Sequence, residues 1–462
     1  MPAGDFDNAV GDVLIAFTQH KLPHSTKLSG APEPRTSSPS PTSTSSRNPC
    51  RLPCSASTPG HHHQPPLATS NQPPQSSQSR LPTFLNHFFP LAGRIASNPR
   101  SGLPEVHCGN QGAELVVGEA SVTLASLDYG RITSTLRQFQ LPYDMDVALS
   151  VQLVSFTCGG FTVAWCTSHV LMDASSMILL VNSWSEHARS GALPAGVRPN
   201  HDRSLLASLH EAFTPLDKRH QVNVLTTQQS MVERLILNRR AASHSRGARA
   251  TRIQAISAYL WKALANVVGE ADECCRMGWW VDGRSRLTTP KISDALTNYI
   301  GNVIAFVVRE ERVQELVRMP LADVAAMVRE AIAAPVYDEH FQELVDWVEE
   351  HKAGRYVDTA SIGLGSPALR ITAAGAAWFD TDFFGLGQQA TLATVTATLV
   401  ARLCAGFVRL GPRPTGDGSW IANAFIWPRL AAALESDEPR VFKDVTAEYL
   451  GLASPQVLRG RL

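Results

Sequence analysis

Residues 161–176 read FTVAWCTSHVLMDASS, an apolar run that passes through a short polar turn toward a second apolar segment. Val, Phe, Thr and Trp concentrated in 161–168 predict a strand. After the serine pair at 175–176, apolar residues return at helical spacing, which predicts a helix to about residue 189. His169 falls at the end of the predicted strand, where a rigid element can hold its ring toward a cleft. A histidine in that position is a candidate general base.

Length and charge limit the classes of protein that this sequence can represent. At 462 residues the chain exceeds what one hydrophobic core usually serves, so two domains are expected. Lys plus Arg and Asp plus Glu both number 41, which gives no electrostatic reason to expect nucleic acid or an anionic membrane as a partner. No run of about 18 apolar residues is present, so no membrane span is expected.

The cysteines and the N-terminus indicate a reducing compartment. The eight cysteines are scattered, and several lie inside apolar runs, as buried free thiols do. The first residues include Asp5 and Asp7 and lack the basic-then-apolar order of a secretory signal. We therefore expect a cytoplasmic protein.

Composition divides the chain into five regions. Residues 1–21 are expected to hold one short strand. Ser, Pro, Thr and Gln dominate 22–80, a low-complexity segment that we predict to be disordered because it has too little apolar surface to bury. An N-terminal domain is expected over 81–200, a crossover linker over 201–222 and a C-terminal domain over 223–462.

Strand-like and helix-like segments alternate irregularly in both domains. We expect helices at 84–89, 174–189, 253–268, 321–334, 337–351 and from 427, and strands at 105–107, 113–117, 150–156, 277–287, 303–309, 368–374, within 390–410 and at 420–427. A tight turn at 158–160 makes the strand before His169 part of an antiparallel hairpin. Because a regular βαβ rhythm is missing, the fold class is α/β with two mixed-sheet domains.

His169 and Asp173 lie four residues apart across the turn. One interpretation is a catalytic base with a carboxylate that fixes the local architecture. The other is a buried histidine with satisfied hydrogen bonds, followed by a helix cap, because Asp173 can accept from the N–H groups of a helix that begins at Ala174. Spacing alone leaves both interpretations open, and a cap can also be a structural carboxylate.

A charged cluster occupies the end of the segment 277–287. Because alternate residues of a strand point to the same face, Asp282, Arg284 and Arg286 would share one face of a strand. The face is either an exposed charged surface or the source of an arginine that pairs with a buried carboxylate.

Several other kinds of site find little support. Gly385 and Gly387 form a pair too short for a phosphate-binding fingerprint, so a tight turn is the better interpretation. The Gly-x-Ser-x-Gly elbow of serine hydrolases does not occur. Cys50, Cys54 and the histidines at 61–63 match no familiar zinc spacing, so no metal site is expected.

Taken together, these stretches resemble the BAHD family of plant acyl-CoA-dependent acyltransferases. The family's His-x-x-x-Asp motif is matched by His169 and Asp173. Further pieces occur in the family's order, over about residues 81 to 450, at 89–95 (FPLAGRI), 257–261 (SAYLW), 281–287 (VDGRSRL), 299–304 (YIGNVI) and 384–387 (FGLG).

The resemblance implies two domains related to chloramphenicol acetyltransferase, with the active site at their interface and a channel for acyl-CoA and a small acceptor. It implies a monomer with no bound cofactor and no metal. His169 would remove the proton from the acceptor's hydroxyl or amine, which then attacks the thioester carbonyl and releases CoA. Asp173 would point away from the substrate and pair with an arginine, for which we favour Arg284 over Arg286.

The resemblance also assigns the C-terminal motif, where this sequence departs from the family. If Asp382 is aligned with the Asp of the family's Asp-Phe-Gly-Trp-Gly motif, an extra Phe interrupts the match. Asp382, Gly385 and Gly387 are expected to be structural. If the sequence is instead aligned without gaps from Ile371, Phe383 takes the position of the motif Asp. In the same alignment Thr372 takes the place of a family threonine that can donate a hydrogen bond to the oxyanion. Ala374 stands where the family has a Trp.

Two further departures affect the N-terminal half. Ala174 replaces the usual Gly after the motif Asp, a mild change. The low-complexity segment 22–80 stands where the family has its first strands, as expected of a gene-model error or a degenerate copy. Missing strands would expose a sheet edge.

The sequence therefore predicts an enzyme that moves an acyl group from acyl-CoA to the hydroxyl or amine of a small plant metabolite. The alternative is an inactive family member that keeps the fold in a binding role. A peptide-synthetase condensation domain is a third possibility, and the missing carrier domain argues against it. The acyl donor, the acceptor and the choice between O- and N-acylation are not predicted.

Overall fold

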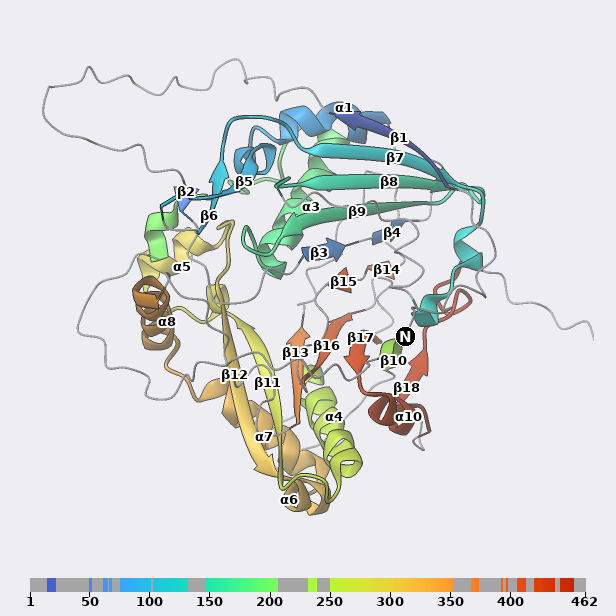
Figure 1. Ribbon diagram of the computed structural model, residues 1–462, viewed down its shortest axis with the longest axis vertical. Helices are drawn as coiled ribbons and strands as arrows, with labels where there is room; N and C mark the ends of the chain where they lie inside the picture. Colours follow the sequence, from blue (N-terminus) through green and yellow to red (C-terminus); the bar gives the residue numbers. More distant parts are fainter. Residues whose placement is uncertain are drawn as a thin grey trace, which may run out of the picture.

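The computed structural model describes most of two sheet-containing units (Figure 1). Described are residues 15–21, 50–51, 61–64, 66–68, 75–100, 103–131, 146–206, 232–238, 250–351, 367–373, 392–393, 396–397, 405–412, 419–436 and 441–452. The predicted α/β class with two mixed-sheet domains is confirmed, because both sheets combine parallel and antiparallel pairs and pack against helices.

The N-terminal sheet is built around the hairpin that ends at His169. Its order is β1-β7-β8-β9-β3-β15, with β4 also pairing β9 and β14 pairing β4. The bounds are β1 Ile15–Lys21, β3 His61–Gln64, β4 Pro66–Ala68, β7 Glu114–Ala120, β8 Ser150–Phe156, β9 Phe161–Ser168, β14 Leu392–Ala393 and β15 Thr396–Ala397. Helices α1 (Gln75–Phe84) and α3 (Ala174–Ser190) lie along one face of this sheet (Figure 1).

The C-terminal sheet has the order β12-β11-β13-β16-β17-β10-β18. Its strands are β10 Val232–Asn238, β11 Cys274–Asp282, β12 Ile304–Arg312, β13 Ala368–Ala373, β16 Ala405–Pro412, β17 Trp420–Ile426 and β18 Phe442–Asp444. The helices of this half are α4 Arg252–Val268, α5 Pro290–Leu296, α6 Val313–Arg318, α7 Leu321–Ala333, α8 Tyr337–His351 and α10 Pro428–Ser436.

Short elements complete the described chain. A small third sheet pairs β2 (Cys50–Arg51), β6 (Pro104–His107) and β5 (Arg94–Ser97). The 3-10 turns are η1 Phe89–Ala92, η2 Leu124–Ser126, η3 Tyr129–Arg131, η4 Arg203–Leu206 and η5 Gly283–Ser285. No helix in the described parts of the chain is long and apolar enough to cross a bilayer.

Each domain has its own buried core. In the N-terminal domain Trp165 of β9 meets Trp184 of α3 edge to face, with ring centroids 5.4 Å apart. In the C-terminal domain Trp261 of α4 meets Trp279 of β11 in the same manner at 6.1 Å. Aromatic pairs of this geometry add to the burial of their area, so each helix is held on its sheet by a large buried contact.

The pleat of the C-terminal sheet separates its two faces. Trp279, Ile371, Val408 and Ala424 lie on four neighbouring strands and belong to the helix-covered core. Alternate residues point to the opposite face. Ile421 on that opposite face packs in a cluster with Val154, Phe156 and other residues of the N-terminal half, so this face looks toward the N-terminal domain.

The structure corrects two local predictions. The segment 277–287 is not one strand, because β11 ends at Asp282, whose carboxylate accepts from the Arg284 N–H at 2.9 Å and starts η5. The helix expected at 84–89 instead lies earlier, because α1 ends at Phe84. The 3-10 turn η1 follows at Phe89–Ala92 with Pro90 in its first turn, where a proline is tolerated.

The low-complexity region holds more order than its composition predicts. Strands β3 (His61–Gln64) and β4 (Pro66–Ala68) pair with β9, while α1 begins at Gln75. β3 and β4 thus lie where the sequence suggested a missing sheet edge.

His187 makes the stability of the N-terminal domain sensitive to acid. Burial between α3 and α1, followed by the nearby positive groups of His87 and Arg80, lowers its pKa to about 4 from 6.5. The unfolded chain therefore binds a proton that the folded chain excludes, and stability should fall as pH drops from about 6.5 toward 4. Urea midpoints measured across this range should decline for the native protein. His187→Gln should flatten the decline, and an equal slope in both proteins would contradict this origin.

Candidate active site

His169 lies directly after β9 at a tight turn. The Thr167 hydroxyl donates to the Ala148 carbonyl at 2.8 Å and fixes the last residues of the strand. The Leu171 N–H donates to the Ser168 carbonyl at 3.0 Å and closes the turn. The half-buried imidazole is thus presented from a rigid element, as a general base requires.

Asn302 contacts both the backbone and the ring of His169. Its Nδ2 donates to the carbonyls of His169, at 2.7 Å, and Val170, at 3.4 Å, which leaves its Oδ1 facing the imidazole. Oδ1 lies 3.1 Å from His169 Nδ1. An amide oxygen only accepts, so the hydrogen-bond network assigns the proton to Nδ1 and makes Nε2 the basic nitrogen of the neutral ring.

Sequence reasoning assigned no role to Asn302. The residue lies 133 positions from His169 and on the other domain, so spacing within the motif cannot reveal the contact. The only signal was its place in YIGNVI, one of the pieces that carry the family resemblance.

Asp173 is fully engaged in structural contacts. One carboxylate oxygen accepts from the Ser176 N–H at 3.0 Å and caps α3, as sequence reasoning allowed. The other accepts from the Val303 N–H at 2.8 Å and from Arg284 at 2.7 Å. With 1% of its side chain exposed, Asp173 ties the first turn of α3 to two segments of the C-terminal domain.

Arg284 is the centre of this polar cluster. Its guanidinium contacts the carboxylates of Asp173 and Asp282, the Ser176 hydroxyl and the Gly301 carbonyl. Burial alone lowers the pKa of Arg284, but the two carboxylates outweigh burial and leave that pKa raised. Arg286, the alternative partner, instead lies over the Tyr337 ring with its guanidinium carbon 5.3 Å from the centroid.

The loop 299–303 joins the two domains at this point. Gly301 bonds in both directions with the Ser176 hydroxyl, at 3.0 Å through its N–H and 2.9 Å through its carbonyl. Asn200, the residue before the crossover linker, pairs with Tyr299 by a parallel bridge. Hence the segment that carries Asn302 is bound by residues of the N-terminal domain and by Arg284.

Thr372, the candidate oxyanion donor, belongs to the C-terminal sheet. Thr372 is half-buried near the end of β13, in register with Trp280 of β11 and Arg409 of β16, on the face toward the N-terminal domain. Asp382, Gly385 and Gly387 lie outside the described residues. The structure therefore brings His169, Asp173 and Arg284 into one region. It places Thr372 on the face of the C-terminal sheet that looks toward the N-terminal domain, which we call the inner sheet face.

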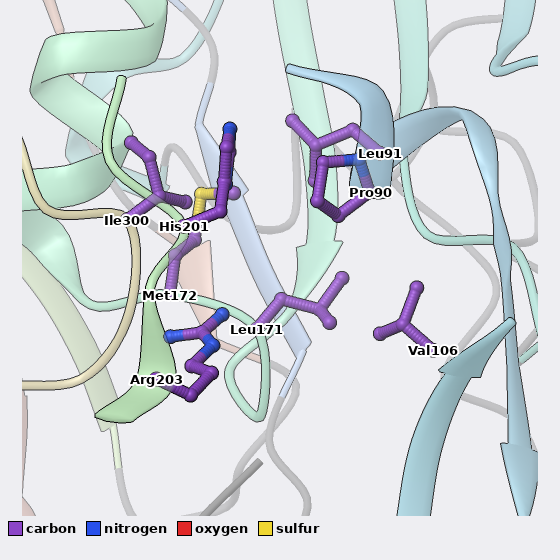
Figure 2. Close-up of a pocket in the computed structure, with 8 residues that line it drawn as sticks. All are labelled: Pro90, Leu91, Val106, Leu171, Met172, His201, Arg203 and Ile300. Atoms are coloured by element: carbon purple, nitrogen blue, oxygen red, sulfur yellow. The ribbon is translucent and has the colours of Figure 1, made fainter. Parts of the chain in front are cut away.

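A small pocket lies against the turn that carries the motif. Figure 2 shows Leu171 and Met172 of this turn, with Pro90 and Leu91, His201 and Arg203 of the crossover, and Ile300 around it. Its lining is mainly apolar and does not include His169, so the pocket is a gap beside the structural loop. Among the described side chains, no three His, Cys, Asp or Glu residues come together as metal ligands would.

The sequence was compared with protein families and with known proteins. The model of the Transferase family matches residues 64–388. An omega-hydroxypalmitate O-feruloyl transferase of Arabidopsis thaliana is 28% identical over 345 residues, which cover 68% of this chain and 72% of the relative. An anthranilate N-benzoyltransferase of Dianthus caryophyllus is 27% identical over 57% of this chain and 63% of its own length.

Solved structures share the same fold. The crystal structure of vinorine synthase superimposes with a TM-score of 0.61 at 19% identity, covering 96% of this chain and 98% of that one. TRI101 of F. sporotrichioides, solved with coenzyme A and T-2, gives a TM-score of 0.65 at 15% identity, covering 83% and 96%. The fold is thus shared with vinorine synthase and TRI101.

The Asp173–Arg284 contact should dominate the local stability. Asp173→Asn leaves the buried guanidinium with one carboxylate instead of two, so we expect a loss of about 3–5 kcal/mol in the free energy of unfolding. Urea denaturation followed by tryptophan fluorescence measures this loss.

Asp282→Asn is the matched control. Asp282 contacts the same guanidinium at 3.2 Å but is 35% exposed, so its loss should cost about 1 kcal/mol or less. Equal effects of the two substitutions would show that burial of Asp173 is not what makes its contact strong.

Proposed function

Because this chain belongs to the BAHD family of plant acyl-CoA-dependent acyltransferases, we propose that it uses His169 as the general base in acyl transfer to a small metabolite. The observation that carries the proposal is the hydrogen bond between Asn302 Oδ1 and His169 Nδ1, which leaves Nε2 to accept a proton. The proposal includes a monomer in the cytoplasm.

The reaction follows from the position of that proton. Nε2 takes the proton of the acceptor's hydroxyl or amine while the acceptor oxygen or nitrogen attacks the thioester carbon. The carbonyl electrons move to its oxygen, and the oxyanion collapses as the carbon–sulfur bond breaks. The imidazolium then returns its proton to the CoA thiolate. The carboxamide of Asn302 keeps accepting from Nδ1–H throughout and holds the ring in one orientation.

Thr372 is the proposed donor to the oxyanion. It lies on the sheet face that looks toward the N-terminal domain, so its hydroxyl comes from the opposite side of the interface to His169. A hydroxyl donor stabilises the charge that develops in the transition state. Asp173 and Arg284 are proposed to act at a distance, by holding the turn and the loop 299–303 in place.

The relatives suggest which acceptors to test. Their names describe transfer to a hydroxyl in omega-hydroxypalmitate and to a nitrogen in anthranilate. For this chain we therefore propose acceptors of both kinds and aromatic as well as aliphatic acyl-CoA donors.

An inactive family member with a binding role is the second candidate. Ala374 stands where the family has a Trp, and the glycine motif at 384–387 is irregular. Turnover of any acyl-CoA and acceptor pair by the purified chain would exclude this alternative.

Substitution of His169 tests the base. CoA release from a panel of acyl-CoA donors and hydroxyl or amine acceptors is followed with a thiol reagent. His169→Ala should lower kcat by about 10²- to 10⁴-fold, because proton removal by a positioned base contributes about that much. Asn182→Ala, an α3 residue far from the turn, is a comparison variant for effects on folding. Unchanged CoA release by His169→Ala would refute the assignment of the base.

A further inference from the structure

We propose that Arg409 binds a carboxylate carried by one of the two substrates, either on the transferred acyl group or on the acceptor. The inference deepens the proposed function and rests on it, since it names the substrate class that the inner sheet face would select.

Three polar side chains form a row across the C-terminal sheet. Thr372 of β13 is in register with Arg409 of β16, and Arg409 is in register with Asn423 of β17. Residues in register on adjacent strands point to the same face and lie about 4.8 Å apart. Arg409 therefore sits between a hydroxyl and a carboxamide.

The row faces the domain interface. Val408 and Leu410, the neighbours of Arg409 in sequence, lie in the helix-covered core. Ile421, two residues before Asn423, packs with residues of the N-terminal half. β13 runs toward the N-terminal sheet (Figure 1), and β16 pairs with it in parallel. Thr372 is the last residue but one of β13. The guanidinium thus lies on the side where the proposed reaction takes place.

Arg409 carries a buried positive charge. Only 8% of the residue is exposed, and burial lowers its pKa to about 9, so it stays largely protonated at neutral pH. The low polarity of a buried site strengthens the attraction between a cation and a nearby anion. A planar guanidinium can also donate two parallel hydrogen bonds to a carboxylate, which gives selectivity as well as affinity.

Arg370 lies on the same face of the sheet as Arg409. Its Nε donates to the Gly406 carbonyl at 3.5 Å, and its guanidinium lies 6.0 Å from the centroid of the Phe407 ring. These contacts are to the adjacent strand. Arg370 lies further from the end of β13 than Thr372 and is therefore a suitable comparison.

The position of Arg409 favours a charge close to the reacting carbonyl. It is the register neighbour of Thr372, the proposed oxyanion donor. The phosphates of CoA are separated from the thioester by the pantetheine arm, so they cannot reach Arg409 while the carbonyl lies at Thr372. The anion must then belong to the acyl group or to the acceptor.

Paired substrates distinguish the two sources. Malonyl-CoA is compared with propionyl-CoA, which replaces the carboxylate by a methyl group, and 3-hydroxybenzoate is compared with its methyl ester. The ratio of kcat/KM within each pair measures the preference for the carboxylate. Arg409→Gln should lower one of these ratios by about 10- to 100-fold, because a charge-assisted hydrogen bond is lost. Arg409→Lys should retain part of the preference.

Further variants separate binding from folding. Asn423→Asp keeps Arg409 but supplies a competing carboxylate from the neighbouring strand, so it should lower the same ratio. Arg370→Gln should leave the ratio unchanged. The inference is overturned if Arg409→Gln changes both members of each pair equally, or if the native protein prefers neither carboxylate.

Binding measurements keep this test independent of turnover. Titration calorimetry of 3-hydroxybenzoate, its methyl ester and malonyl-CoA against native protein and Arg409→Gln reports the same preference without catalysis. If Arg409→Gln loses the preference for carboxylate ligands while the native protein shows no turnover, the carboxylate site is supported and the proposed enzymatic function is rejected. If the native protein turns over and Arg409→Gln keeps the same preference, the enzymatic function is supported and the carboxylate site is rejected.

Discussion

The buried contact between Asp173 and Arg284 is the interaction on which the rest of the site depends. It joins the start of α3 to η5, the 3-10 turn directly after β11, and the same carboxylate accepts from the Val303 N–H, one residue after Asn302. Asn302 contacts the imidazole of His169, so the Asp173–Arg284 contact supports the segment that orients the proposed base. A buried pair is costly to break, and this cost keeps the two domains in one relative arrangement at the interface.

The sequence predicted much of this arrangement from local signals. The strand at 150–156, the hairpin and the helices near 174–189, 253–268 and 337–351 follow from periodicity and turn residues, and the structure has them at nearly the same bounds. Asp173 was placed as a cap because its position before Ala174 is a local property. Arg284 entered through the family resemblance, since its partner lies 111 residues away.

Other features were not accessible from local patterns. The strand predicted over 277–287, which is β11, extends too far, because alternation continues through residues whose backbone is turned by the Asp282 side chain. The contact of Asn302 with His169 and the row of Thr372, Arg409 and Asn423 each arise from pairing between distant segments. Register across a sheet depends on the whole topology, and no pattern within one strand encodes it.

The two domains therefore divide the proposed chemistry between them. The N-terminal domain supplies the base, and the C-terminal domain supplies the residue that orients it and the polar row on the inner sheet face. The most direct test is a crystal structure with CoA and an acceptor bound. The account predicts the acceptor's hydroxyl or amine within hydrogen-bonding distance of His169 Nε2, with Asp173 still bound to Arg284. An acceptor bound away from Nε2, or Asp173 turned toward the substrate, would contradict it.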